Sequence, residues 1–341
     1  MQIEITDHKF IDPDNHLGNI PDTLVPGEEA CLMSVGIVGA GFIGRGWAIC
    51  FARAGKAVRL WDPTPGAAPA AYEYIAAIAE DLASFGLLRG CSPDEIMSRI
   101  HVSGTMAEAV EGVDHVQENA PEKLDLKCRL FRELDEAVSP DAVIASSTSA
   151  LLPSAFTKGL RGAGRMIVAH PVNPPHLIPL VELVPSPWTA QETIARTEIL
   201  LRETGQSPVR LEAEIDGFLL NRLQAAVLDE AFRLVADGYA SAAAVDACMR
   251  DGLARRWSFM GPFETIDLNA PGGIRDYVLR YQNMFRGMTD TMRRSVDWSG
   301  PVLDTIEGER RGQLPHSRLA ERQMWRDRQL AAFSAFHRES P

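Results

Sequence analysis

The pattern of apolar and polar positions divides the chain into three parts. Residues 1–33 are polar, acidic and aperiodic. From Ser34 to about residue 213, short apolar runs alternate with longer segments of helical periodicity, which is typical of an α/β fold. After that point only helical patterns follow. We therefore expect an irregular N-terminal arm (1–33), an α/β domain (34–213) and an all-helical domain (214–341).

Six apolar runs in the α/β part predict strands. Their ranges are 34–40, 57–62, 113–120, 142–149, 165–171 and 179–185. Helical patterns lie between most of them, and strands that are joined through helices usually run parallel. The sequence therefore predicts a Rossmann-type, doubly wound and mostly parallel sheet with helices on both faces. In the last part, apolar residues recur every three or four positions over 217–238, which predicts a long amphipathic helix.

Composition narrows the class of partner. There are 46 Asp and Glu residues against 34 Lys and Arg, a formal charge of −12, and an acidic surface argues against nucleic acid as a partner. No apolar stretch approaches the roughly 20 residues needed to span a bilayer, so no membrane partner is expected. The five cysteines are dispersed without a CxxC pair, which favours reduced thiols in the cytoplasm and gives no sign of a metal site.

The N-terminal arm allows two interpretations. Met33 stands directly before the first predicted strand, so either residues 1–33 are a genuine extension or translation starts at Met33. A polar, aperiodic composition is typical of irregular structure in both cases.

A glycine-rich turn joins the first predicted strand to the first predicted helix. The sequence GAGFIG (39–44) is a G-x-G-x-x-G motif. Its first glycine permits a tight turn, its second lets the backbone approach a pyrophosphate, and its third lets the helix pack closely on the strand. The N-terminus of the helix then faces the phosphates. The expected cofactor contacts of this turn are Gly39, Gly41, Phe42, Ile43 and Gly44.

An acidic residue follows at the end of the second predicted strand. Asp62 lies 18 residues beyond the last glycine of the motif. A carboxylate at this position accepts hydrogen bonds from the adenosine ribose and repels a 2′-phosphate. The sequence therefore predicts NAD, rather than NADP, as the cofactor.

One histidine and one glutamate stand out among the later apolar runs. His170 lies near the end of RMIVAHP, and Glu182 lies in PLVELVP. In open parallel sheets, ligands bind beyond the carboxyl ends of the strands. If the two strands are neighbours, the carboxylate fixes the tautomer of the imidazole, and the free ring nitrogen moves a hydroxyl proton of the substrate. A histidine satisfied inside the core is the alternative, but a buried glutamate in a matching strand favours the pair.

Two further polar residues allow alternatives. Ser149 lies in SSTSALLPS (146–154), which follows a predicted strand where a helix begins, so its hydroxyl could also act as a helix cap. Asn221 lies in the first turn of the long predicted helix, where capping or a subunit contact is equally compatible with the pattern.

These motifs resemble the 3-hydroxyacyl-CoA dehydrogenase superfamily over nearly the whole chain from Ser34. The resemblance implies a Rossmann domain, a helical domain that forms a homodimer, and NAD-dependent oxidation of a 3-hydroxyl group. It also implies a catalytic Ser-His-Glu-Asn set. That set falls on Ser149 in SSTSAL, His170 in AHPVNP, Glu182 in PLVELV and Asn221 in GFLLNR. The resemblance places further NAD contacts at Glu118, Lys123 and Asn173.

The chain departs from the acyl-CoA members in two places. Those enzymes carry lysines for the CoA phosphates on the segment after the second strand, whereas residues 63–88 contain no Lys or Arg here. Arg256, in GLARRWSFMGPFE, stands where those members look apolar. Its guanidinium could clamp a carboxylate through two parallel hydrogen bonds, or form only a surface ion pair. We therefore expect a small, free 3-hydroxy acid as the substrate.

Two branches of the superfamily that do not use CoA look similar to the chain. HPVNPPHLIPLVELVP and GFLLNRLQ resemble the L-gulonate 3-dehydrogenase branch, which includes lambda-crystallin, whereas WDPTPGA and RWSFMG resemble the carnitine 3-dehydrogenase branch. HPVNPP and Asn221 favour the gulonate type. Trp257 and Phe259 leave a quaternary ammonium substrate open. A 3-hydroxybutyryl-CoA dehydrogenase ranks third, and an NAD-binding structural protein without turnover is the remote alternative.

Overall fold

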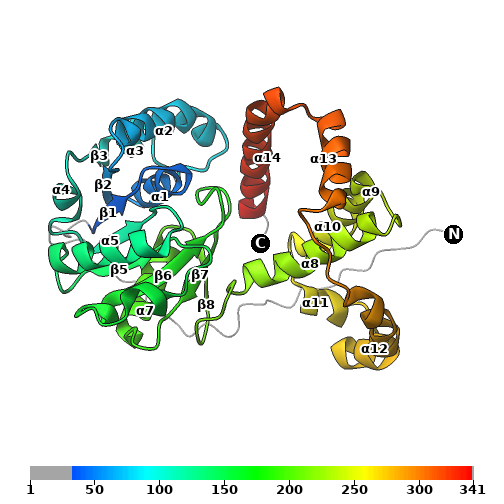
Figure 1. Cartoon of the computed structure of the whole chain (residues 1–341). Coiled ribbons are helices and arrows are strands. Elements are labelled where there is room, and N and C mark those ends of the chain that lie inside the picture. The colour runs from blue at the N-terminus through cyan, green and yellow to red at the C-terminus, as the bar shows by residue number, and fades with distance from the viewer. Residues whose placement is uncertain (1–32, 340–341) are drawn as a thin grey trace, which may run out of the picture. The chain divides into compact units, whose positions relative to one another are not determined.

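The computed structural model describes residues 33–339, so the expected arm, apart from Met33, lies outside the described residues. The described part of the chain contains one eight-stranded sheet in the order β3-β2-β1-β4-β5-β6-β7-β8 (Figure 1). Its strands are β1 (Ser34–Val38), β2 (Ala57–Trp61), β3 (Ile100–Val102), β4 (His115–Glu118), β5 (Val143–Ser146), β6 (Met166–Pro171), β7 (Leu180–Val184) and β8 (Ser207–Arg210). Every neighbouring pair is parallel except β6 with β7. The predicted Rossmann-type, mostly parallel sheet is confirmed.

The two strands that sequence reasoning missed are β3 and β8, which form the two edges of the sheet. Each has one buried residue, at Ile100 in β3 and at Pro208 in β8, and the other residues of both strands are exposed. An edge strand of this kind carries no apolar run, so the hydrophobic pattern does not distinguish it from a loop.

The direction of β7 also differs from the simplest expectation. The chain returns from β6 through residues 172–179 without a helix, so β7 runs antiparallel to β6. This pairing places His170 directly opposite Glu182. The two residues therefore meet as cross-strand neighbours, and not at the carboxyl ends of two parallel strands.

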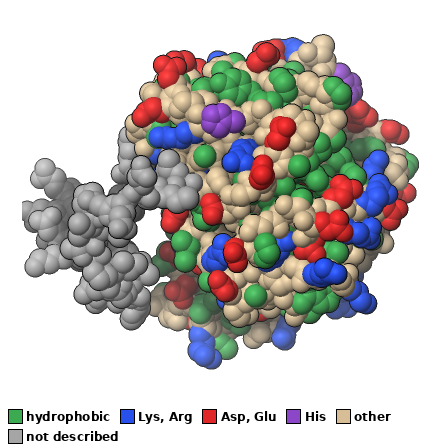
Figure 2. Space-filling view, turned by 90° about the vertical axis from the view of Figure 1, so that its left-hand side faces the viewer, with side chains coloured by type: hydrophobic (Ala, Val, Ile, Leu, Met, Phe, Trp, Pro, Cys, Tyr) green, Lys and Arg blue, Asp and Glu red, His purple; other side chains and the backbone are tan. Residues whose placement is uncertain are grey.

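Helices cover both faces of the sheet. They are α1 (Phe42–Arg53), α2 (Ala67–Ser84), α3 (Pro93–Ser98), α4 (Met106–Val110), α5 (Leu124–Ala137), α6 (Pro153–Thr157), η1 (Ala163–Arg165) and α7 (Gln191–Glu203). One buried cluster joins α1 and α2 to the sheet through residues such as Trp47 and Ile75. A second cluster, around Phe131 of α5, packs on the other face. On the side of the molecule seen in Figure 2, acidic, basic and apolar side chains are interspersed.

The chain after β8 is helical, as expected. Its elements are α8 (Leu220–Ala236), α9 (Ala242–Ala247), the π-helix η2 (Cys248–Leu253), α10 (Ala254–Trp257), α11 (Pro262–Asp267), α12 (Gly273–Met292), α13 (Pro301–Gln313), η3 (His316–Arg318) and α14 (Leu319–Glu339). The long helix predicted over 217–238 corresponds to α8. Within residues 33–339, no helix has the length and apolar character needed to cross a membrane.

Helix α14 returns to the α/β part of the molecule. Ala331 belongs to the buried cluster of α1 and α2. The Ser334 hydroxyl donates a hydrogen bond of 2.8 Å to the carbonyl oxygen of Leu177, and Arg328 lies 3.3 Å from the Asp81 carboxylate of α2. The C-terminal helix thus stands beside α2, and residues of both helices line one cavity (Figure 1).

Candidate active site

The three glycines of the 39–44 turn have distinct steric environments. Gly39 adopts φ +100°, and a Cβ atom there would lie 2.9 Å from the carbonyl oxygen of Asn119. A Cβ atom on Gly44 would lie 1.9 Å from the carbonyl oxygen of Gly39. A Cβ atom on Gly41 would meet nothing within 4 Å. The first and third glycines are therefore required by the fold, whereas the second faces open space that a ligand could enter.

Asp62 binds the backbone of the glycine turn. One oxygen of its carboxylate accepts the backbone N–H of Ala40, and the other accepts that of Thr64, both at 2.8 Å. Helix α1 begins just above, and no side chain caps its first N–H groups. A cavity of about 470 Å³ adjoins Asp62 and Asn119. A helix N-terminus for phosphates, a carboxylate for a ribose and an adjacent cavity fit a bound NAD molecule.

The other expected cofactor contacts differ in how accessible their side chains are. Phe42 is 68% exposed at the start of α1, and Asn173 is exposed in the loop after β6; both line one cavity of about 260 Å³. Lys123 is exposed at the N-terminus of α5. Ile43 instead packs against the buried cluster of α1 and α2. Phe42, Asn173 and Lys123 are thus accessible to a ligand, and Ile43 serves the core.

Glu118, also expected to contact the cofactor, has partners inside the protein. Its side chain is fully buried, and both carboxylate oxygens lie 2.9 Å from the ammonium of Lys127, which is also fully buried. The Ser146 hydroxyl and the backbone N–H of Ala120 donate to the same carboxylate. These partners satisfy the carboxylate inside the protein, so Glu118 fixes the segment that borders the cavity next to Asp62.

A hydrogen-bonded group that sequence reasoning missed lies beside this pair. The Ser147 hydroxyl accepts from the indole N–H of Trp47 at 3.0 Å and from the amide of Gln117 at 2.8 Å. It donates to Asn119 Oδ1 at 2.7 Å. The group ties α1 to the ends of β4 and β5. Serines that follow a strand were singled out in the sequence, but nothing in the pattern distinguishes Ser147 from its neighbours.

The His170–Glu182 pair is present in the structure. Nδ1 of His170 lies 2.8 Å from Oε2 of Glu182, and both side chains are buried. The other carboxylate oxygen, Oε1, accepts the backbone N–H groups of Leu219 at 2.7 Å and Leu220 at 2.9 Å. Burial alone raises the pKa of the Glu182 carboxyl, but the hydrogen bonds from His170 and from the two N–H groups outweigh it and leave the pKa below its ordinary value.

The backbone before α8 is shaped for this contact. Gly217 and Phe218 both have positive φ angles, +74° and +49°. They turn the chain so that the next two N–H groups point at the carboxylate. The buried ring of Phe218 also packs 5.5 Å from the imidazole of His170. Phe218 was not singled out from the sequence, because a buried aromatic residue at positive φ leaves no periodic signal.

Ser149 and Asn221 lie next to this pair. The side-chain amide of Asn221 donates a hydrogen bond of 2.7 Å to the carbonyl oxygen of Ser149. Asn221 directly follows Leu220, whose N–H binds Glu182, so a continuous chain of contacts joins all four residues of the expected set. The Ser149 side chain is exposed just beyond β5. Four strands, β1, β4, β5 and β6, run parallel, so the glycine turn lies at the same carboxyl end of the sheet as Ser149 and His170.

Arg256 lies in the helical part of the chain. It is exposed on α10, and no hydrogen bond or ion pair joins its side chain to Ser149, His170 or Asn221 within the described residues. The structure therefore brings together the four expected catalytic residues and the glycine turn, and the role of Arg256 as a carboxylate clamp stays a prediction.

The arrangement is suited to general acid–base chemistry. With Glu182 ionised, Nδ1 of His170 carries the proton that it donates to Oε2, so Nε2 keeps a free lone pair. This tautomer follows from the hydrogen bond, and the carboxylate also stabilises the imidazolium that forms when Nε2 takes a proton.

Comparison with known proteins matches nearly all of the chain beyond the arm. Residues 34–215 match the family model "3-hydroxyacyl-CoA dehydrogenase, NAD binding domain", and residues 217–305 match "3-hydroxyacyl-CoA dehydrogenase, C-terminal domain". The chain is 44% identical to lambda-crystallin of Oryctolagus cuniculus, over 89% of this chain and 96% of that protein. It is 35% identical to L-carnitine dehydrogenase of a Pseudomonas species, over 86% and 91% of the two chains.

A solved structure supports the fold alone. A 5-formyl-3-hydroxy-2-methylpyridine 4-carboxylic acid 5-dehydrogenase aligns with a TM-score of 0.75 at 24% identity, covering 90% of this chain and 98% of that chain.

Two glycine substitutions test the turn. Gly41→Ala places a methyl group in open space at a φ of −68°, so we expect unfolding free energy to change by less than about 0.5 kcal/mol while NAD binds about tenfold more weakly. Gly44→Ala forces the turn apart, so we expect it to lose about 1–3 kcal/mol of stability as well as NAD affinity. Urea denaturation and titration calorimetry measure the two quantities. If Gly41→Ala binds NAD as tightly as the unaltered protein, the turn is not the pyrophosphate site.

Proposed function

The chain belongs to the 3-hydroxyacyl-CoA dehydrogenase family, and from this premise we propose that it oxidises the 3-hydroxyl group of a small free hydroxy acid with NAD+, as an L-gulonate 3-dehydrogenase does. The observation that carries the proposal is the buried pair of His170 and Glu182, at the same sheet edge as the glycine turn. A non-catalytic protein would have no need to bury an imidazole–carboxylate pair there, because burying such a pair is costly.

In the proposed mechanism, His170 is the general base. Its Nε2 takes the proton of the substrate's 3-hydroxyl, and Glu182 holds the ring and stabilises the imidazolium. When bound, NAD+ supplies the acceptor for the hydride that leaves C3, the carbon that carries the 3-hydroxyl. Ser149 and Asn221 bind the substrate oxygen, and the Asn221–Ser149 hydrogen bond keeps these two residues in register. In the reverse reaction His170 returns the proton.

The proposed cofactor contacts follow the geometry of the turn. Gly39, Gly41 and Gly44 shape the backbone around the pyrophosphate, and Asp62 receives the adenosine ribose. Phe42, Lys123 and Asn173 are accessible and are retained as direct contacts. Ile43 and Glu118 also stay proposed as cofactor contacts; the side chain of Ile43 packs on the core and that of Glu118 binds Lys127.

The face of α2 supports a free acid over a CoA thioester. The resemblance assigns CoA-binding lysines to this segment, but residues 63–88 carry no cation. Helix α14 begins beyond the region that the family models match, and its residues line one cavity together with Tyr74 and Ile78 of α2. A CoA moiety on this face would therefore meet both acidic side chains and the C-terminal helix.

The identity of the acid is a finer proposal. The chain keeps Asn221 and the HPVNPP sequence of the gulonate type. Its similarity to lambda-crystallin, at 44% identity, extends over 89% of this chain, whereas the 43% identity to L-carnitine dehydrogenase of Streptomyces griseus extends over 70%. For carnitine, the expected aromatic cage would rest on Trp257 and Phe259. Both are exposed on and just after α10, at 39% and 66%. Carnitine therefore remains the second candidate, followed by 3-hydroxybutyryl-CoA.

The substrate is tested by NADH formation with L-gulonate, L-carnitine, 3-hydroxybutyrate and 3-hydroxybutyryl-CoA under identical conditions. We expect the highest kcat/KM with L-gulonate. Arg256→Ala should raise the KM for the acid about tenfold without a comparable fall in kcat, because a carboxylate clamp acts on binding. Arg202→Ala, which changes an exposed arginine on α7, is the matched control. A preference for the CoA thioester overturns the free-acid proposal. If none of the four substrates gives NADH formation, the alternative of an NAD-binding structural protein without turnover is favoured.

A homodimer is proposed through the helical part. Helix α12 has no buried residue, although it is amphipathic and 20 residues long. Large apolar side chains on α12 are exposed, and they continue onto α11: Phe263, Ile274, Val278, Leu279, Tyr281, Met284, Phe285, Met288 and Met292. An exposed apolar surface of this extent is typical of a subunit interface.

Sedimentation tests the dimer. We expect the unaltered protein to sediment as a dimer and Phe285→Glu to sediment as a monomer, because a buried, unpaired carboxylate opposes association. Circular dichroism checks that the variant is folded. A monomer for the unaltered protein at every concentration contradicts the dimer.

The proposed compartment is the cytoplasm. Of the five cysteines, Cys50, Cys91, Cys128 and Cys248 lie in the described part of the chain and are free thiols. Unpaired, dispersed thiols favour a reducing compartment.

A further inference from the structure

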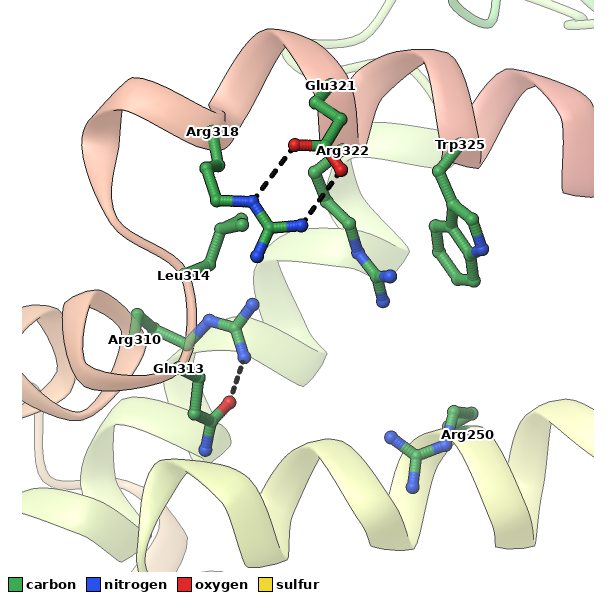
Figure 3. Close-up of a pocket in the computed structure, with 8 residues that line it drawn as sticks. All are labelled: Arg250, Arg310, Gln313, Leu314, Arg318, Glu321, Arg322 and Trp325. Carbon is green, nitrogen blue, oxygen red and sulfur yellow. Dashed lines mark hydrogen bonds and ion pairs between the residues drawn. The ribbon is translucent and has the colours of Figure 1, made fainter.

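A cavity in the helical part is lined mainly by arginines. It has a volume of about 480 Å³ and lies between η2, α13 and α14, away from the glycine turn and the His170–Glu182 pair. Its lining residues are Arg250, Arg310, Gln313, Leu314, Arg318, Glu321, Arg322 and Trp325. Figure 3 shows the guanidinium groups reaching into the same space from helices on opposite sides, with the indole of Trp325 along one flank. The volume is within the range of sites for small molecules.

The charges around this cavity are unbalanced. Four guanidinium groups line it against a single carboxylate, that of Glu321, which binds Arg318 through two hydrogen bonds of 2.8 and 2.9 Å. Arg322 has no carboxylate within ion-pair distance among the described residues, and its guanidinium lies 3.4 Å from the ring centroid of Trp325. One lining arginine is thus held by an aromatic ring alone, which leaves its outward N–H groups available.

The other two arginines are paired with a neutral amide and with exposed carboxylates. Arg310 donates to the neutral amide of Gln313 at 2.7 Å, and its nearest carboxylate, Asp246, is 3.6 Å away. Arg250 donates hydrogen bonds of 2.9 and 2.6 Å to Asp251, its neighbour in the chain, and this pair is exposed to solvent. Exposed pairs of this kind contribute little to stability, so a ligand with stronger acceptors can take over these donors.

The positive charge of the cavity contrasts with the acidic character of the whole chain. The chain as a whole carries a net charge of −12, and every cationic side chain from residue 214 onward is arginine rather than lysine, histidine aside. Planar guanidinium groups bind the paired oxygens of carboxylates and phosphates, and several of them facing one space repel each other unless an anion lies between them.

We propose that this cavity binds a small molecule with two or more negative charges on oxyanion groups, such as a phosphate ester or a polycarboxylate. Arg310, Arg318 and Arg322 bind the oxyanion groups, and Trp325 forms the apolar side of the site. The site is separate from the site of oxidation, and the proposal does not depend on the identity of the oxidised substrate.

Titration calorimetry tests the site with citrate and with inorganic pyrophosphate, on the full-length protein in saturating NAD so that the glycine turn is occupied. Sodium chloride at equal ionic strength is the control for screening. We expect saturable binding of at least one of the two anions, and the anion that binds identifies the preferred chemistry. The variant Arg310→Gln/Arg322→Gln should bind that anion at least about tenfold more weakly, because it loses two charged donors. Arg328→Gln, on the same α14 but outside the cavity, should bind it unchanged.

Three results overturn the proposal. They are no saturable binding of either anion, equal affinity in the double variant, and equal loss of affinity in Arg328→Gln. Circular dichroism and NAD affinity establish that each variant is folded, and single substitutions at Arg310 and Arg322 replace the double variant if it is not. An acidic segment of a second copy of the chain is the alternative occupant of the cavity, and sedimentation of the double variant tests it. If the dimer dissociates in the double variant and neither anion binds the unaltered protein, the cavity belongs to the subunit contact.

Discussion

The buried hydrogen bond between His170 and Glu182 is the interaction on which the rest of the site depends. A carboxylate with 1% of its surface exposed stays ionised only if it is well supplied with donors. Glu182 has three: the imidazole on one oxygen, and the backbone N–H groups of Leu219 and Leu220 on the other. These last two bonds tie the sheet to the start of α8. The acid that orients the histidine therefore also positions the helix that carries Asn221.

A second buried pair has a comparable role at the cofactor end of the same edge. Glu118 and Lys127 are fully buried and bind each other, and Ser146 completes the group. Removing one partner of such a pair leaves an uncompensated charge, which typically costs about 3–5 kcal/mol. The group fixes the segment 118–120 against which Gly39 packs. Two buried ionic groups thus define the two ends of the proposed site: Glu118–Lys127 at the cofactor end and His170–Glu182 at the substrate end.

The sequence predicted the parts of this arrangement that leave a periodic or motif signal. Apolar runs located six of the eight strands, and the glycine motif located the turn above Asp62. The edge strands β3 and β8 were missed because their exposed positions carry no apolar run. The antiparallel direction of β7 was not anticipated, since it depends on a loop of eight residues that contains no helix. Phe218 and the Ser147 group were missed because their roles come from a turn and from contacts between distant segments.

The histidine and glutamate were chosen from the sequence on chemical grounds, and the fold brings them to 2.8 Å. Their role in the reaction is tested most directly by the rate of NADH formation in a single turnover by His170→Ala, with the affinity for NAD measured on the same sample. The account predicts a rate about 10²–10⁴-fold lower with an NAD affinity close to that of the unaltered protein. A variant that binds NAD normally and keeps most of its rate would contradict the assignment of His170 as the base.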